Sequence, residues 1–150
     1  MNQKHFLVAT DGSPGACEAV EQGTALAREA GAAITLVSVR HAPLPVLGDP
    51  YYRRTLSAEL ARARAVVEQA AAAVVAAGVE VETEILEGNP AESIAELARS
   101  HGVDLIIVGS RGRGGIVGGL LGSVSEGVVH RADRPVLVVK PRSKTARRAA

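Results

Sequence analysis

The residues best suited to chemistry lie in a glycine-rich stretch that begins at Gly109 and ends at Ser125. Seven glycines occur from position 109 to 122, and Ser123 follows them directly. A backbone without Cβ atoms can approach a polyphosphate closely, and the first amides of a following helix offer donors and the positive end of the helix dipole. Arg111 or Arg113 can add a charged fork. The stretch therefore predicts a phosphate site, with a mobile loop before a serine-capped helix as the alternative.

The elements that would position this stretch alternate as apolar strands and helical patterns, which is typical of βαβ proteins. Strands are expected at His5–Thr10, Ala33–Arg40, Val79–Leu86, Asp104–Gly109 and Pro135–Lys140. Helices are expected at Pro14 to about Ala30, about Arg53 to Ala77, Pro90 to near His101, and about Ser123 to Arg131. The 150 residues fit one α/β domain.

Charge argues against a nucleic-acid partner. Residues 1–139 carry 12 basic and 16 acidic side chains, a balance of −4, and the chain has only three aromatic residues. Such a body has neither the basic face nor the stacking platform of a nucleic-acid reader. Residues 142–150 form a basic tail that we expect to be disordered, with contact to an acidic partner as the alternative.

Targeting and redox signals predict a cytoplasmic protein. No apolar run approaches the ~20 residues that span a bilayer, and the first ten residues lack the pattern of a secretory signal. Cys17 is the single cysteine, which excludes an internal disulfide and favours a reducing compartment. The four histidines are scattered without metal-ligand spacing, so we expect them to be structural.

Familiar phosphate motifs do not fit. A P-loop needs Lys before its Ser or Thr, whereas Leu120 and Leu121 precede Gly122 and Ser123. A dinucleotide fingerprint would follow the first strand, where only Asp11-Gly12-Ser13 stands. No Gly-x-Ser-x-Gly elbow indicates a nucleophilic serine.

The spacing Gly109-x2-Gly112-x9-Gly122-Ser123 resembles the ATP-binding motif of the universal stress protein family. The resemblance extends to Asp11, to residues 36–39 and to residues 134–139, and it covers residues 4–141. It assigns 1–141 to one universal stress protein domain. It implies a Rossmann-like, open parallel five-stranded sheet of order 3-2-1-4-5 with helices on both faces. Ligands bind such sheets at the carboxyl ends of strands beside the switch in strand order, which brings Asp11 and Gly109 to one crevice.

The resemblance also implies a residue-by-residue site for ATP. Asp11 and Val39 would receive adenine and ribose, beside the backbone of Val108 and Gly109. Arg111 and Gly112 would face the ribose and phosphates. The phosphates would be held by Gly122, Ser123, Val124 and Ser125. Asp11 could also help to hold Mg²⁺, or it could merely cap the first helix.

The function expected from this resemblance is a dimeric, ATP-binding sensor or regulator in stress response. A slow ATPase or nucleotidyl-transfer enzyme using the same pocket is one alternative, and a dimeric scaffold without nucleotide is another. The homodimer is expected through Val136–Val139, because this apolar run would occupy an open sheet edge that only Arg134 and Lys140 flank.

Overall fold

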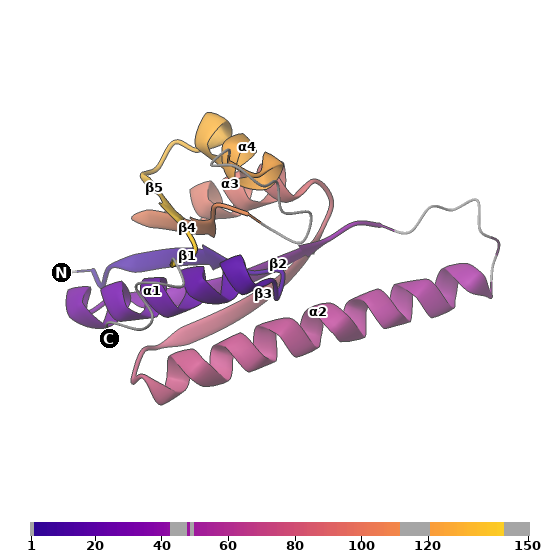
Figure 1. Cartoon of the computed structure of the whole chain (residues 1–150), viewed down its shortest axis with the longest axis horizontal. Coiled ribbons are helices and arrows are strands. Elements are labelled where there is room, and N and C mark those ends of the chain that lie inside the picture. Colours follow the sequence, from indigo (N-terminus) through magenta and orange to yellow (C-terminus); the bar gives the residue numbers. More distant parts are fainter. Residues whose placement is uncertain (1, 43–47, 49, 112–120, 143–150) are drawn as a thin grey trace.

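A computed structural model, which describes residues 2–42, 48, 50–111 and 121–142, contains a single parallel sheet (Figure 1). Its order is β3-β2-β1-β4-β5, so the predicted order and fold class are confirmed. The strands are β1 His5–Ala9, β2 Ala33–Arg40, β3 Val81–Glu87, β4 Leu105–Gly109 and β5 Val136–Val139. The order reverses between β1 and β4, which places the carboxyl ends of these two strands beside a switch point.

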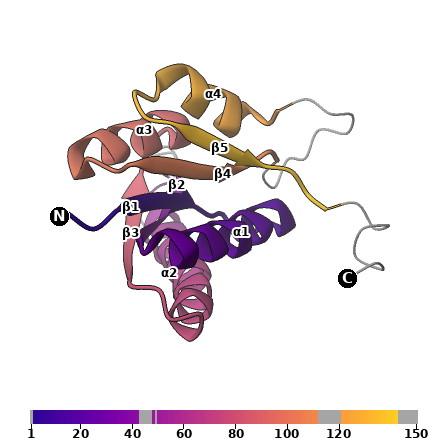
Figure 2. The ribbon, with the colours of Figure 1, turned by 90° about the vertical axis from the view of Figure 1, so that its left-hand side faces the viewer.

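Helices cover both faces of the sheet (Figure 2). The helices are α1 Pro14–Ala30, α2 Tyr51–Ala76, α3 Pro90–His101 and α4 Ser123–Arg131. α1 and α2 bury Ala19, Val20 and Val74 against one face, whereas α3 and α4 bury Ile94 and Val128 against the other. The core is built from branched aliphatic residues and alanine, as a sheet buried on both faces requires.

Capping residues set the helix boundaries where the sequence predicts them. The Ser13 side chain accepts a hydrogen bond from the Ala16 amide at 3.2 Å, with Pro14 in the first turn. Asn89 accepts from the Glu92 amide at 3.1 Å in the same manner. The left-handed glycine at the end of α1 is Gly31, with φ of 65°.

The third strand begins at Val81, two residues after the predicted start at Val79. The Val79 amide donates to the carbonyl of Val74 at 3.3 Å, so this residue is still bonded to the last turn of α2, which ends at Ala76. α2 itself begins at Tyr51, two residues before the predicted start. These shifts arise because backbone hydrogen bonds, and not the apolar character of a side chain, determine the residue at which a helix or strand begins.

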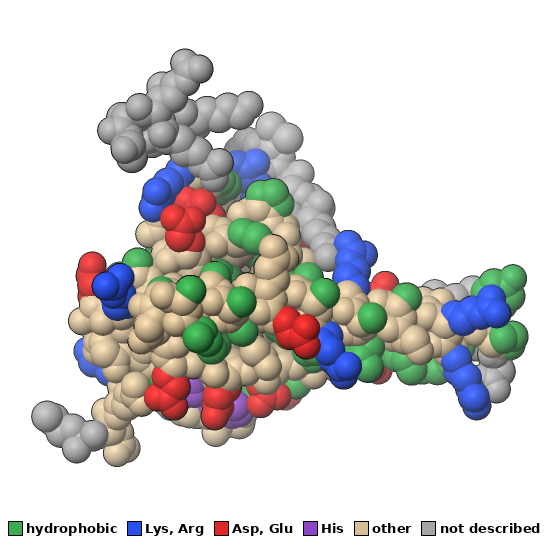
Figure 3. All heavy atoms as spheres, turned by 90° about the horizontal axis from the view of Figure 1, so that it is seen from below, with side chains coloured by type: hydrophobic (Ala, Val, Ile, Leu, Met, Phe, Trp, Pro, Cys, Tyr) green, Lys and Arg blue, Asp and Glu red, His purple; other side chains and the backbone are tan. Residues whose placement is uncertain are grey.

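α2 is longer than the strands on which it packs, and its N-terminal end projects from the body (Figure 1). Its 26 residues extend about 39 Å, whereas the eight residues of β2 extend about 26 Å. Its buried residues are Ala63, Val67 and Val74, so the first turns lie beyond the part that packs on the sheet. Basic side chains flank the projecting end, and hydrophobic side chains lie at its tip (Figure 3). No helix in the described part of the chain has both the length and the apolar character needed to cross a membrane.

The open edges of the sheet are β3 and β5. Beyond β5, the Arg142 Nε lies 3.1 Å from the Glu18 Oε1 on α1, and only 7% of the Glu18 side chain is exposed. Arg142, the first residue of the predicted tail, is therefore tied to the folded body. Residues 143–150 lie outside the described residues.

Candidate functional site

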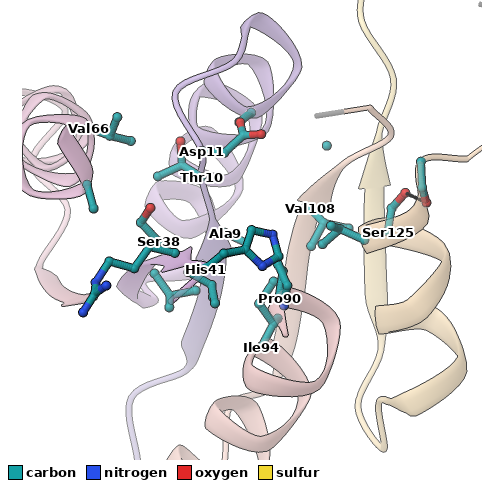
Figure 4. A pocket seen from close by; sticks show the side chains of 18 of the residues that line it. Ala9, Thr10, Asp11, Ser38, His41, Val66, Pro90, Ile94, Val108 and Ser125 are labelled. Atoms are coloured by element: carbon teal, nitrogen blue, oxygen red, sulfur yellow. Dashed lines mark hydrogen bonds between the residues drawn. The ribbon is translucent and has the colours of Figure 1, made fainter. Parts of the chain in front are cut away.

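A cavity of about 480 Å³ lies at the carboxyl ends of β1, β2 and β4, beside the switch in strand order (Figure 4). Loops and helix ends from both sides of the sheet contribute to its wall. Its lining includes all the predicted site residues that the structure describes: Asp11, Val39, Val108, Gly109, Arg111, Gly122, Ser123, Val124 and Ser125. The tenth, Gly112, lies outside the described residues. The volume is within the range of small-molecule sites.

The N-terminus of α4 faces this cavity with a glycine as its N-cap. Gly122 has φ of −64° and ψ of 159°, and among the described residues no side chain caps the helix. Within this part of the chain the first-turn amides of α4 therefore have no side-chain cap, and the helix dipole favours an anion there. A Cβ at Gly122 would lie 3.1 Å from the Ser110 carbonyl oxygen, so the backbone is closely packed at this position. Ser123 is exposed at the same helix end. This arrangement fits a phosphate group.

Ser125 is buried and braces this end of the cavity. Its hydroxyl lies in donor geometry to the carbonyls of Gly122 at 2.9 Å and Ser110 at 3.3 Å. The Gly122 amide donates to the Ser110 carbonyl at 2.7 Å, and the Ser110 amide donates to the Val139 carbonyl of β5 at 2.8 Å. Because its proton is directed at backbone carbonyls, Ser125 holds the start of α4 in place rather than offering a free hydroxyl.

Asp11 lies in the turn between β1 and α1 and lines the cavity. Its Oδ1 accepts a hydrogen bond from the Ser13 amide at 2.9 Å, while Ser13 provides the cap of α1. Asp11 is therefore not the helix cap. No group of three or more His, Cys, Asp or Glu side chains in the described ranges could hold a metal ion. A Mg²⁺ here would depend on one carboxylate and on ligand phosphates, which is a common mode for this ion.

The side of the cavity toward α3 is mostly apolar. Ala9 and Val108 lie near Pro90 and Ile94 there, and the imidazole of His41 lies among them (Figure 4). Val39 also lines the cavity. Val108 is 3% exposed and Ile94 is 2% exposed, so their packing is fixed by the core. This wall is suited to a flat apolar ring next to the phosphate end.

A further wall comes from α2 and the end of β2. It contains residues for which the sequence predicts no site role: Ser38, Arg40, Glu59, Arg62, Ala63 and Val66. His41 was expected to be structural, yet it lies in the lining. The signal for this wall is the predicted length of the second helix, which must carry its first turns past the carboxyl edge of the sheet. Cys17, in the first turn of α1, is exposed.

Comparison with known sequences decides the family. The sequence profile described as "Universal stress protein family" matches residues 2–140. The chain belongs to the universal stress protein family. A universal stress protein from Thermus aquaticus, encoded in the 3' region of a QAH/OAS sulfhydrylase, is 38% identical over 139 residues, which cover 91% of this chain and 98% of the relative.

Solved structures share the fold of this universal stress protein. Protein MJ0577 of Methanocaldococcus jannaschii superposes with a TM-score of 0.84 at 28% identity, covering 96% of this chain and all of the other. A universal stress protein solved in complex with cAMP has a TM-score of 0.70 at 27% identity, covering 95% of this chain and 100% of its own.

Proposed function

We propose that this universal stress protein binds ATP with Mg²⁺ in the cavity at the carboxyl ends of β1, β2 and β4. The observation that carries the proposal is the start of α4, where the N-cap is a glycine and no described side chain caps the first-turn amides. Phosphates fit at Gly122 and Ser123, and the adenine ring fits the apolar wall at Val39. The relative solved with cAMP supports an adenine nucleotide as the ligand class.

Asp11 would hold the Mg²⁺ together with the nucleotide phosphates, and Arg111 would contribute a positive charge near them. The cation neutralises phosphate charge when it is bound. In the described lining, the carboxylates are Asp11 and Glu59, and they lie on different elements. Asp11 is engaged by the Ser13 amide. Such a site is suited to retaining a nucleotide, and we therefore favour a sensor or regulator in stress response over an ATPase.

The active form in this proposal is a homodimer that pairs through β5. β5 forms an open edge of the sheet, and the Ser110 amide connects it directly to the phosphate end of the cavity. A strand edge with unpaired backbone groups favours pairing with an identical strand across a two-fold axis.

Calorimetry of the purified chain with ATP, GTP and adenosine, with and without Mg²⁺, tests the proposed function. We expect ATP to bind more tightly than adenosine, because only the phosphates reach α4, and more tightly than GTP. Adenosine binding as tightly as ATP would contradict the phosphate site. The absence of binding by all three ligands would favour a scaffold without nucleotide, and rapid ATP turnover would favour the enzyme.

A further inference from the structure

We infer that Gly15, which lies outside the cavity lining, is a positioning residue for the phosphate end of the site; this inference rests on the proposed nucleotide function. Gly15 is buried in the first turn of α1. An ideal Cβ on Gly15 would lie 2.6 Å from the carbonyl oxygen of Arg111, which is much closer than side-chain carbons approach a backbone oxygen. The glycine thus allows the chain leaving β4 to pass directly over the start of α1.

The close approach is reciprocal. An ideal Cβ on Gly109, the last residue of β4, would lie 2.8 Å from the Gly15 carbonyl oxygen and 3.3 Å from the Ala16 amide nitrogen. Two backbones are therefore in contact at a point where both residues lack a side chain. Neither glycine has a positive φ, so the close contact, and not a special backbone conformation, requires glycine here.

This contact governs where the phosphate end lies. Between Gly109 and Arg111, the Ser110 carbonyl accepts the Gly122 amide at 2.7 Å and also faces the Ser125 hydroxyl. A displacement of the Arg111 backbone is therefore transmitted to the first turn of α4. Gly15 sets the distance between α1 and this segment without touching the ligand.

A side chain at position 15 would displace the backbone at Arg111, directly after the end of β4, rather than α1. α1 is held in place at this end by the Ser13 cap and by the buried Ala16 and Ala19. Gly109 is fixed by its pairing with Val139 in β5. Arg111, by contrast, is half-buried and lies beyond the end of the strand. Helix preference alone favours alanine over glycine at position 15, so any loss in Gly15→Ala comes from the contact.

The test compares Gly15→Ala with Gly23→Ala in the same helix. Gly23 is a matched control, because its Cβ would meet Ile107 Cδ1 at 3.0 Å and Val8 Cγ2 at 3.1 Å, which are core side chains outside the cavity. Calorimetry with ATP and with adenosine gives the ratio of the two affinities for each chain, and thermal unfolding reports the fold. We expect Gly15→Ala to bind ATP about tenfold more weakly with adenosine affinity nearly unchanged, because a misplaced anion site loses its phosphate contacts.

Gly23→Ala should unfold at a lower temperature than wild type while keeping the wild-type affinity ratio. Gly109→Ala, which adds a Cβ to the same contact from the other side, should reproduce the loss of ATP preference. If wild type binds ATP, two results would overturn the positioning role. One is an unchanged ratio of ATP to adenosine affinity in Gly15→Ala, and the other is the loss of its cooperative unfolding transition. A wild-type chain without ATP binding would overturn the proposed function and this inference together.

Discussion

At the scale of single residues, Gly122 carries the central physical claim. We predict that Gly122→Val weakens ATP binding about tenfold or more, because an amide contact to a charged group is worth about 1.5–3 kcal/mol. The Cβ would lie 3.1 Å from the Ser110 carbonyl oxygen and 3.5 Å from the Arg111 Cα, so the two further methyl groups would crowd this backbone and displace the start of α4. Calorimetry on wild type, Gly122→Ala and Gly122→Val gives a graded series, with alanine in between. Equal ATP affinity across the series would show that phosphate binding does not require glycine at position 122.

The carboxylates of the lining lead to a second prediction, slow turnover. Bound ATP should be hydrolysed far below the typical enzyme range of about 1–10³ s⁻¹, because the two carboxylates of the described lining, Asp11 and Glu59, lie on different elements and Asp11 already accepts the Ser13 amide. Phosphate release by wild type and Glu59→Gln is the measurement, and both chains should show the same low rate. Release near one per second that Glu59→Gln abolishes would instead identify Glu59 as a base and support the enzyme.

At the scale of elements, the sequence predicts the features that depend only on residues close together along the chain. Ser13, Asn89 and Gly31 cap helices at the boundaries expected from the sequence, next to Pro14, Pro90 and Ala30, because capping needs only neighbours along the chain. Apolar runs likewise predict every strand, although β3 begins at Val81 because Val79 is bonded to the end of α2.

The site is predictable only in part, for the same physical reason. The glycine motif and Asp11 mark the cavity because each follows a strand at the switch in strand order. Only the predicted length of the second helix indicates the wall formed by Glu59 and Val66, since these residues occupy an ordinary amphipathic helix. The packing role of Gly15 cannot be predicted from its neighbours in the sequence, because the atom that requires glycine is in the Arg111 backbone about a hundred residues away.

α2 supplies the third prediction, which concerns stability. Val67 is 2% exposed and packs where α2 crosses the sheet, whereas Val75 is 62% exposed on the same helix. Val67→Ala should lower the free energy of unfolding by about 2 kcal/mol through lost burial and a residual cavity. Val75→Ala, the matched control, should change it by less than about 0.5 kcal/mol. Urea denaturation compares the two, and equal effects would mean that α2 does not pack as described.

At the scale of the whole molecule, the open edge of β5 leads to the fourth prediction. The carbonyls of Pro135 and Val139 accept from the amides of Ile106 in β4 and of Ser110 directly after it. Alternate residues of β5 therefore face β4, and Val138 presents its amide to the open edge. Val138→Pro should remove that donor without breaking the β4 pairing and should convert the proposed dimer to a monomer.

Light scattering at micromolar concentration measures the mass, and Val138→Ala is the control because it keeps the amide. Lysine at this position would be a poor test, since Val138 packs against the cluster beneath α3 and α4. A monomeric wild type would end the dimer proposal. A Val138→Pro chain that remained dimeric would move the interface to another surface.

Phosphate binding at the start of α4 is tested most directly by a titration of the isotope-labelled chain with ATP and Mg²⁺, followed through its backbone amide resonances. We expect the largest shifts at Ser123 and Val124 in the first turn of α4, and at Val39 beside the apolar wall. Adenosine should shift Val39 and leave the α4 amides nearly unchanged. Shifts confined to the opposite end of the sheet, around the small cleft at Lys4, His5 and Glu80, would contradict the proposed site.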